Sequence, residues 1–540
     1  MTVQKSIIAS PQPSVSIDPP PSRMARSAGV LALATTASRV LGFIGAMLMA
    51  GLFGTTAQSQ AFVVAFRLPN LLRDLVAEGA VTSAFVPVLS WYRAKASPEE
   101  FWKLTQALWT RASILLCGLG LLGSLAAPWL VRLIAPGFLA DPEKFALTVR
   151  LTRILFPFIT LVGLWAFFMG LLNSLRHFAV PALGSAVLNL ATIAACVWWV
   201  PLTTPGILAV AMGVMIGGAM QLAMQVPVAM SRGFRFGWRW SHPGARDIVR
   251  LLGPRVIGSA VYQASVLMDT ILASLGAIVG EGAVAALFFA NRLVQLPLAV
   301  FGTASAQASL PTLSEHAAHR DMAAFRGTLI HVTRMVGFVI LPSAVGLMVL
   351  AFPIVGGLFE RGAFDHRATV MTAQALICYS IGLLAYAVSK VITGAFYAMH
   401  DTWTSVRLAL EALSLNLVLC LLLMWPMKIA GLALAAALAN SLNAFRLMRR
   451  LEQRLGQPLL APVLAAFGRM LLASIGMGAC CALLWYTLDG HLHALMRLLL
   501  VIGCGPPAYL LGCWLLRVEE WSRVTQWLRQ FPLWRYFAPE

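Results

Sequence analysis

Long apolar stretches separated by short polar gaps run through almost the whole chain. A helix that crosses a bilayer needs about 20 mainly apolar residues, and the stretches here are continuous rather than alternating, which argues against the strands of a membrane barrel. We therefore predict an all-α integral membrane protein with about 14 transmembrane helices. The predicted spans are 27–53, 58–90, 104–134, 146–173, 180–200, 206–230, 247–277, 283–312, 324–352, 369–398, 403–425, 428–448, 461–487 and 493–516.

The first residues do not follow this pattern. Residues 1–25 are rich in Pro, Ser and Gln and offer little apolar surface to bury, so we expect a disordered cytoplasmic tail. They also lack a charged stretch leading into a short apolar region with a small-residue cleavage site, so we expect no cleaved signal peptide.

Composition supports a membrane protein. Of the 540 residues, 59% are hydrophobic and 11% are charged, and the mean hydropathy is +0.79. A soluble domain carries about 25% charged residues, and so few charges would leave large apolar patches on a surface in water. The net charge of +19 would suit nucleic acid. Most Lys and Arg lie in the gaps between apolar stretches, however, so we expect the lipid bilayer and no nucleic acid as a partner.

The basic residues also orient the chain. Alternate gaps are basic, for example 93–103, 232–246, 446–454 and 517–535, whereas the gaps between them carry little net positive charge. Lys and Arg gather on the cytoplasmic side of membrane proteins. We therefore expect a multi-pass protein of the bacterial inner membrane with both termini in the cytoplasm, which requires an even number of spans.

The sequence lacks the motifs of common enzymes and nucleotide-driven pumps. No G-x-x-x-x-G-K-[ST] loop is present to hold ATP phosphates, and no H-E-x-x-H or G-x-S-x-G stands in a suitable context. The eight cysteines lie inside apolar stretches without metal-ligand spacing. We expect a protein that is not an enzyme, holds no cofactor or metal, and draws on the membrane potential or a monovalent cation for any work.

Four arginines lie where a bilayer should exclude charge. Arg39 is central in the first span, Arg292 is central in the eighth, and Arg67 and Arg73 flank a Leu-Pro-Asn break in the second. A central Arg costs about 2.5–3.5 kcal/mol to insert, so such residues face water or a partner. Arg67 and Arg73 have a second interpretation, in which they cap a helix near the cytoplasmic face and extend to the interface.

Few acids are available to neutralise these arginines. Within the spans they are Asp74, Glu78 and Asp269, and a cavity with surplus guanidinium suits an anion such as phosphate. For Asp269 two interpretations stay open. It either accepts a hydrogen bond from Ser or Thr on a neighbouring helix, or it binds a cation that couples transport to a gradient, with Asn416 as a second ligand.

Several motifs give the chain a family resemblance. They are Ser-Arg-Val-Leu-Gly-Phe at 38–43, Ala-Phe-Arg-Leu-Pro-Asn-Leu-Leu-Arg at 65–73, Ala-Glu-Gly-Ala at 77–80, Ala-Phe-Val-Pro at 84–87 and Leu-Phe-Glu-Arg-Gly at 358–362. Together they resemble the MurJ/MviN family of lipid II flippases. The similarity runs from about residue 25 to the C-terminus, although the last two spans are similar only in character.

The resemblance implies the fold of the multidrug/oligosaccharidyl-lipid/polysaccharide exporters. That fold has two six-helix lobes around a central cavity, and this family adds two helices that form a groove for a lipid tail. The implied N-lobe is 26–231, the C-lobe 232–455, the groove helices 456–518 and a cytoplasmic tail 519–540. The implied function is to flip lipid II, the undecaprenyl-pyrophosphate-linked peptidoglycan precursor, to the periplasmic leaflet by alternating access.

The resemblance also assigns a substrate site. Three family arginines thought to hold the pyrophosphate correspond to Arg39, Arg73 and Arg292, which are also costly to bury. Cell-wall synthesis proteins are candidate partners. The further candidates for the substrate site are Arg67, Glu78 and Asn291.

The chain departs from the family beside the expected cavity. An Arg-Asp pair common in the family is replaced by Gly45-Ala46, and three acids are replaced by Gln60, Asn291 and Gln295. The remaining guanidiniums are therefore less neutralised, which favours an anionic ligand.

Several alternatives remain open at this point. They are a specialised paralogue, an exporter of another undecaprenyl-linked oligosaccharide, and a non-transporting scaffold for cell-wall assembly. An antiporter for cationic drugs would need acids in its cavity, and a polytopic glycosyltransferase would need catalytic acids in a large outward loop. The sequence offers neither feature.

Overall fold

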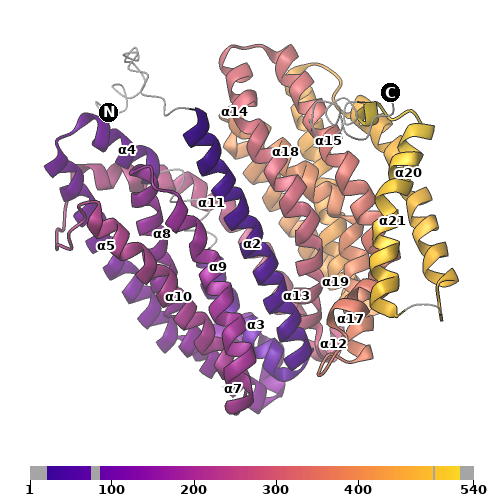
Figure 1. Ribbon diagram of the computed structural model, residues 1–540, viewed down its shortest axis with the longest axis horizontal. Helices are drawn as coiled ribbons and strands as arrows, with labels where there is room; N and C mark the ends of the chain where they lie inside the picture. The colour runs from indigo at the N-terminus through magenta and orange to yellow at the C-terminus, as the bar shows by residue number, and fades with distance from the viewer. Residues whose placement is uncertain (1–20, 74–84, 491–492, 523–540) are drawn as a thin grey trace.

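The computed structural model describes residues 21–73, 85–490 and 493–522, and these residues form helices and short connections without a β-strand (Figure 1). The prediction of an all-α membrane protein is confirmed. The first described helix begins at Pro21 and residues 1–20 lie outside the described part, so the tail of 1–25 stays a prediction. Most of the predicted tail of 519–540 also lies outside the described part.

One set of helices, called here the N-group, is drawn in indigo to magenta on the left of Figure 1. It also contains the short helices η2 (Pro136–Ala140), η3 (Ala195–Trp199) and η4 (Val200–Leu202). The α-helices of the N-group are α2 (Pro21–Phe53), α3 (Ala57–Arg73), α4 (Val86–Lys95), α5 (Pro98–Leu125), α6 (Ala127–Ile134), α7 (Pro142–Leu155), α8 (Phe158–Ser174), α9 (Ala179–Ala194) and α10 (Ile207–Ser231).

A second set, the C-group, lies to its right and is joined to it by the long helix α11 (Pro243–Ala273). The helices of the C-group are α12 (Gly276–Val279), α13 (Ala283–Pro297), η5 (Leu298–Thr303), α14 (Ala304–Ala318), α15 (Met322–Val349), α16 (Ala351–Phe359), α17 (His366–Ile381), α18 (Leu383–Ala398) and α19 (Thr402–Leu455). The hairpin of α20 (Leu460–Thr487) and α21 (Ala494–Leu515) packs at the right-hand edge (Figure 1).

Helix α19 is a hairpin of two antiparallel helices. Its backbone leaves helical geometry at Lys428, with φ of 52° and ψ of −128°, just after Pro426. Its two ends then meet, because Arg454 forms an ion pair with Asp401 and Arg446 bonds Glu411 at 3.2 Å. The predicted spans 403–425 and 428–448 therefore correspond to the two arms of one hairpin.

Several predicted spans consist of two helices in succession. Proline marks two of these breaks: it occupies an early position of α6 and the N-cap of α8, where the missing N–H costs little. A third pair, α17 and α18, is bent by 45°. Ten helices among the described residues are long and apolar enough to cross a bilayer, or eleven with the bent pair. The exact number of fourteen spans stays a prediction.

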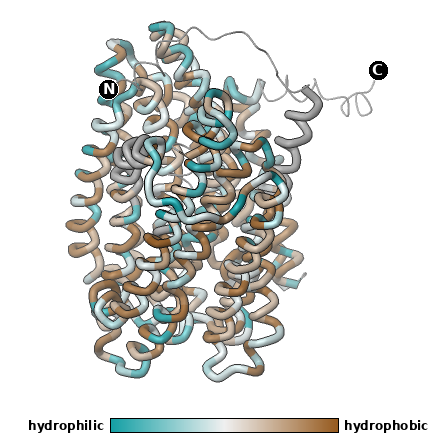
Figure 2. The backbone as a smooth tube through the Cα atoms, turned by 90° about the vertical axis from the view of Figure 1, so that its left-hand side faces the viewer, coloured by the Kyte–Doolittle hydropathy of each residue, from teal (hydrophilic) through white to brown (hydrophobic). Residues whose placement is uncertain are grey.

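The outer surface of the bundle suits lipid. Large apolar side chains such as Leu115, Leu122, Leu472 and Leu499 are more than half exposed. Hydrophobic positions are frequent at mid-height of the bundle and hydrophilic ones toward its ends (Figure 2). The first described residues of α2 and the end of α21 lie at the same end of the bundle (Figure 1), as an even number of crossings requires.

The two groups contact each other at the opposite end, called here the closed end. The N–H of Ala363 donates to the carbonyl of Gly51 at 2.8 Å, and the N–H of Gly137 donates to Ser274 Oγ at 3.2 Å. A Cβ added to Gly54 would lie 2.1 Å from the carbonyl oxygen of Ala363. Backbone therefore meets backbone across this junction, and glycine is what permits the close approach.

An ion pair crosses the same junction. Lys144 of α7 places its Nζ 3.3 Å from Glu281 Oε2, in the turn before α13, and 4.1 Å from the centre of the Phe138 ring. The Lys144 side chain is only 5% exposed. A buried ammonium needs a carboxylate or an aromatic face nearby, and here the second group of helices supplies the carboxylate.

Replacing Gly54 with alanine should destabilise the fold. Gly54 has φ of 51°, which costs an L-residue about 1–2 kcal/mol, and the new methyl would also overlap a carbonyl. We expect the thermal unfolding midpoint in detergent to fall by several degrees. The matched control is Gly118→Ala in α5, where the added Cβ meets nothing within 4 Å. Equal midpoints for the two variants would show that the junction tolerates a side chain.

Candidate functional site

Arg39 and Arg292 lie on helices that share a contact at the closed end. Thr55, just after α2, packs against Gly282, just before α13. Arg39 is fourteen residues from the end of α2 and Arg292 nine residues from the start of α13. At 1.5 Å per residue they stand about 21 Å and 14 Å along their helices from this contact. Both therefore lie deep within the bundle, one in each group.

Packing of α2 against α9 fixes where Arg39 points. The backbone carbonyl of Ser38 accepts a hydrogen bond from Asn189 Nδ2 at 2.8 Å, and Gly42 lies against the same side chain. Ser38 and Gly42 therefore face α9, while the Arg39 side chain is exposed. Arg292 is also exposed, with its guanidinium 5.2 Å from the centre of the Phe288 ring.

Helix α3 carries the other two arginines on one side of the same junction. It starts at Ala57, so Arg67 and Arg73 stand about 15 Å and 24 Å along the helix from the closed end. Both side chains are half-buried. Arg67 Nε donates to Thr270 Oγ1 of α11 at 3.0 Å. Arg67 thus links α3 to α11 inside the bundle, rather than extending to an interface.

Asp269 and Asn416 are in direct contact. Asn416 Nδ2, on the first arm of α19, donates to Asp269 Oδ1 at 3.1 Å and to Ser265 Oγ at 3.4 Å. Asn416 is 2% exposed, and Cys420 Sγ donates to its Oδ1 at 3.6 Å. An amide on a neighbouring helix therefore bonds Asp269, and the two interpretations of this residue, a hydrogen bond from Ser or Thr and a cation site, stay predictions.

The polar cluster around Asp269 connects the substrate-site candidate Arg67 with the ion-site candidates Asp269 and Asn416. Thr270, the acceptor for Arg67, follows Asp269 directly, and the charge of Arg67 acts on the Asp269 carboxylate. Three elements meet here, namely α3 of the N-group, α11, and α19 of the C-group. Sequence spacing could not show this meeting, because 147 residues separate Asp269 from Asn416.

The remaining candidates differ in position. Asn291 is exposed beside Arg292 on α13, and Gln295 one turn further is half-buried. Glu78 lies outside the described residues. Gln60 is 4% exposed and donates from Nε2 to the Thr55 carbonyl at 3.2 Å, so it takes part in the closed end.

Two of the positions that depart from the family pattern, Gly45 and Ala46, are half-buried and buried on α2. A Cβ on Gly45 would lie 3.8 Å from Ile193 of α9, and Ala46 is 5% exposed. Small residues here bring α2 close to its neighbour. The lost Arg-Asp pair would have to share this packed face, so its absence changes helix packing as well as charge.

The ion pair of Lys144 with Glu281 was not anticipated from the sequence. Lys144 stood out only as a single basic residue beside Asp141 and Glu143. In the structure Asp141 caps α7 by accepting from the Lys144 N–H at 3.1 Å, while the side chain of Lys144 reaches across to Glu281. No local signal indicates a partner 137 residues away.

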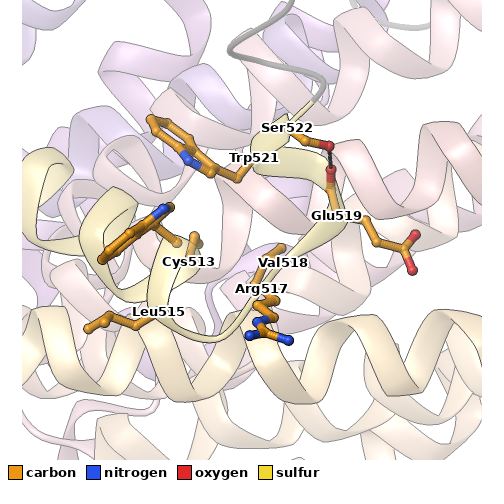
Figure 3. Close-up of a pocket in the computed structure, with 8 residues that line it drawn as sticks. Cys513, Leu515, Arg517, Val518, Glu519, Trp521 and Ser522 are labelled. Atoms are coloured by element: carbon orange, nitrogen blue, oxygen red, sulfur yellow. Dashed lines mark hydrogen bonds between the residues drawn. The ribbon is translucent and has the colours of Figure 1, made fainter.

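Other chemistry is sparse in the part of the chain that the structure describes. No group of three or more His, Cys, Asp or Glu side chains is arranged there to hold a metal ion. A pocket of about 500 Å³ opens at the end of α21, lined by Trp514, Arg517 and Trp521 among others (Figure 3). Glu519 also lines this pocket and bonds Arg334 of α15 at 2.7 Å.

Comparison with known proteins gives a consistent result. The sequence model of the family described as "Lipid II flippase MurJ" matches residues 49–501. The lipid II flippase MurJ of Burkholderia cenocepacia is 33% identical over 426 residues, which cover 78% of this chain and 82% of that protein.

Two solved structures share the fold. A lipid II flippase MurJ in an inward closed conformation superposes with a TM-score of 0.76 at 24% identity, covering 89% of this chain and 97% of that one. An inward-facing multidrug transporter of the MATE family superposes with a TM-score of 0.65 at 13% identity, covering 78% and 94%. The expected exporter fold is confirmed.

Cysteines placed at the two central arginines should react with a charged, membrane-impermeant thiol reagent. Arg39 and Arg292 are exposed, so Arg39→Cys and Arg292→Cys in a background without native cysteines should be labelled in inside-out vesicles, as detected by mass shift. Ala290→Cys, whose parent residue is fully buried, is the unreactive control. Labelling no faster than this control would mean that neither arginine faces an aqueous chamber.

Proposed function

We propose that this protein, which belongs to the MurJ family of lipid II flippases, moves lipid II from the cytoplasmic to the periplasmic leaflet of a bacterial inner membrane. The observation that carries the proposal is the pair of exposed arginines, Arg39 and Arg292, placed deep in the bundle on helices of opposite groups. A guanidinium at this depth is costly unless water or an anion meets it.

The pyrophosphate of lipid II is the anion that these arginines would hold. Arg39, Arg73 and Arg292 replace the water around its oxygens, because the planar guanidinium fork bonds phosphate oxygens in pairs. Arg67, on α3 with Arg73, and Asn291, which precedes Arg292 on α13, would orient the sugar-proximal oxygens. Glu78, outside the described residues, completes the proposed site.

The closed end supports transport by alternating access. In the observed state the N-group and C-group meet through Gly51 with Ala363, Gly137 with Ser274, and Lys144 with Glu281. Opening the bundle at this end would separate these pairs and release the head group to the periplasm. The lipid tail would stay in the bilayer, beside the hairpin of α20 and α21.

The membrane potential would help the anion outward. With the inside negative, each charge that crosses the whole field gains about 2.3 kcal/mol per 100 mV, so a pyrophosphate of about −2 gains nearly 5 kcal/mol. Return of the empty protein carries its positively charged arginines inward, which the same field also favours. A monovalent cation bound at Asp269 and Asn416 would move inward with them and add to that gain.

The arrangement of the cation site couples it to the arginines. Asn416 turns its amide N–H toward Asp269, so a cation would displace this hydrogen bond, turn the amide oxygen toward the carboxylate, and compete with Arg67 for the charge of Asp269. Arg67 would keep its bond to Thr270 but lose part of the attraction of the Asp269 carboxylate, which loosens the link between α3 and α11. Cell-wall synthesis proteins are proposed partners, since they consume lipid II on the far side.

Loss of a central arginine should abolish transport. Arg39→Ala or Arg292→Ala should fail to rescue a flippase-depleted strain and should leave lipid II in the cytoplasmic leaflet, although the variant protein reaches the membrane at normal abundance. The control is Arg367→Ala, an exposed arginine in the first turn of α17. Full rescue by either central variant would remove that residue from the site. Retention of a different undecaprenyl-linked glycan would indicate another substrate.

Removal of the Asp269 charge should abolish stabilisation by a small cation. Ligands that bind the folded state raise its unfolding midpoint, so NaCl or KCl should raise the midpoint of the purified protein more than choline chloride of equal ionic strength. Asp269→Asn keeps the side-chain shape and should show no such difference. Glu143→Gln, an exposed acid of α7, serves as the control. A cation effect that persists in Asp269→Asn would place the ion elsewhere.

A further inference from the structure

An extended segment, residues 232–242, connects α10 to α11 and runs along α5 (Figure 1). Its sequence is Arg-Gly-Phe-Arg-Phe-Gly-Trp-Arg-Trp-Ser-His, with three arginines, four aromatic rings besides the histidine, and no acid. The proposed transport mechanism gives this segment no role.

Both ends of the segment are fixed to the N-group. Phe234 is 1% exposed, and its ring lies 5.4 Å from that of Phe168 and 6.2 Å from that of Trp109. At the other end His242 is 6% exposed, with Nε2 3.1 Å from Glu100 Oε2 and Nδ1 accepting from the N–H of Gly244. The segment therefore has a defined path.

Side chains of α5 satisfy the backbone between these ends. Gln106 Nε2 donates to the carbonyl of residue 235 at 3.1 Å, and Arg111 Nε donates to the carbonyl of residue 240 at 3.0 Å. Thr110 Oγ1 accepts from the N–H of residue 239 at 3.0 Å. The backbone is turned toward α5, so the longer side chains of the segment are left to face outward.

Those outward side chains are aromatic and basic. Trp238 is 72% exposed and Trp240 is 70% exposed. Arg239, between the two tryptophans in sequence, and Arg235, which precedes them, are exposed as well. Exposed tryptophan is uncommon on a surface in water but is enriched where protein meets the bilayer interface. The Glu100 carboxylate of α5, which contacts the end of the segment, is occupied, since it bonds both Lys103 and His242.

The residues of α5 that bond the segment indicate that it lies at the level of the bilayer interface. Arg111 is the last charged residue of α5, and exposed apolar side chains begin three residues after it, with Ile114 at 43%, Leu115 at 63% and Leu122 at 64%. Residues 235–240 are bonded to α5 between Gln106 and Arg111. They therefore lie where the lipid-facing part of α5 gives way to its polar part.

We propose that residues 235–240 form a binding surface for anionic phospholipid headgroups of the adjacent leaflet, which the basic gaps assign to the cytoplasmic side. The Trp238 and Trp240 rings occupy the headgroup level, and the Arg235 and Arg239 guanidiniums bond lipid phosphates in pairs. The positive charges of Arg235 and Arg239 thus meet the negative charge that the leaflet carries. The proposal is independent of the substrate that the protein transports.

Such a surface would hold the connection between the two groups at a constant depth. The segment is bonded to α5 along its length and continues directly into α11, which leads to the Asp269 cluster. Anchoring to lipid would keep the start of α11 with the N-group while its other end contacts the C-group.

A photo-cross-linking experiment on the full chain tests this surface. Trp238→p-benzoylphenylalanine is reconstituted into bilayers of phosphatidylglycerol and phosphatidylcholine, irradiated, and its lipid adducts are quantified by mass spectrometry. We expect the ratio of anionic to neutral adducts to exceed the bulk ratio by about fivefold, the effect of roughly 1 kcal/mol from a basic residue near an anionic surface. The same probe at Leu122, which faces lipid on α5, should report the bulk ratio.

The charges of the segment are tested in the same assay. Arg235→Gln with Arg239→Gln should return the adduct ratio at position 238 to the bulk value, whereas Arg449→Gln with Arg450→Gln, an exposed pair on α19, should leave it enriched. A bulk ratio at position 238 in the unaltered background would overturn the proposal. So would adducts to protein instead of lipid in native membranes, which would identify the surface as a protein-docking site.

Discussion

A charged group at bilayer depth must be paired or hydrated, and the internal arrangement of this protein follows from that constraint. Insertion of one unpaired arginine costs several kcal/mol. Arg67 meets the constraint by bonding Thr270 beside the Asp269 carboxylate. Arg39 and Arg292 meet it differently, because their side chains are exposed on helices of opposite groups. Arg67 therefore serves as a structural link between helices, whereas Arg39 and Arg292 present guanidiniums that an anion can reach.

The closed end provides the frame in which these residues are placed. Direct contact between backbones requires positions without a side chain, and Gly51, Gly54 and Gly137 supply them. Such contacts are short and hold one geometry. Apolar packing accompanies them, because the Phe43 ring of α2 lies 6.2 Å from the Phe359 ring of α16 and both groups contribute to one buried apolar cluster. The buried Lys144 adds an ion pair whose partner belongs to the other group.

Helix α11 connects the regions that matter for the proposed function. It begins beside the N-group, where Gly244 lies against the Tyr92 ring, and it ends at the cluster that contains Arg67 and Asn416. A movement of one group relative to the other therefore acts on this helix at both ends. The extended segment before it, with its exposed tryptophans, sets where the helix starts with respect to the lipid.

The sequence by itself determined the fold class and the chemistry. Apolar stretches long enough to span a bilayer identified the helices, because lipid leaves a backbone few other ways to satisfy its hydrogen bonds, and the cost of burying charge singled out Arg39, Arg67 and Arg292. Only the tertiary structure decided which of these residues meet. The contact of Asp269 with Asn416 joins helices that are distant in sequence, and so does the ion pair of Lys144 with Glu281. Hydropathy measures the affinity of a segment for lipid and carries no information about which helix lies beside it, so partners of this kind are fixed only when the helices pack.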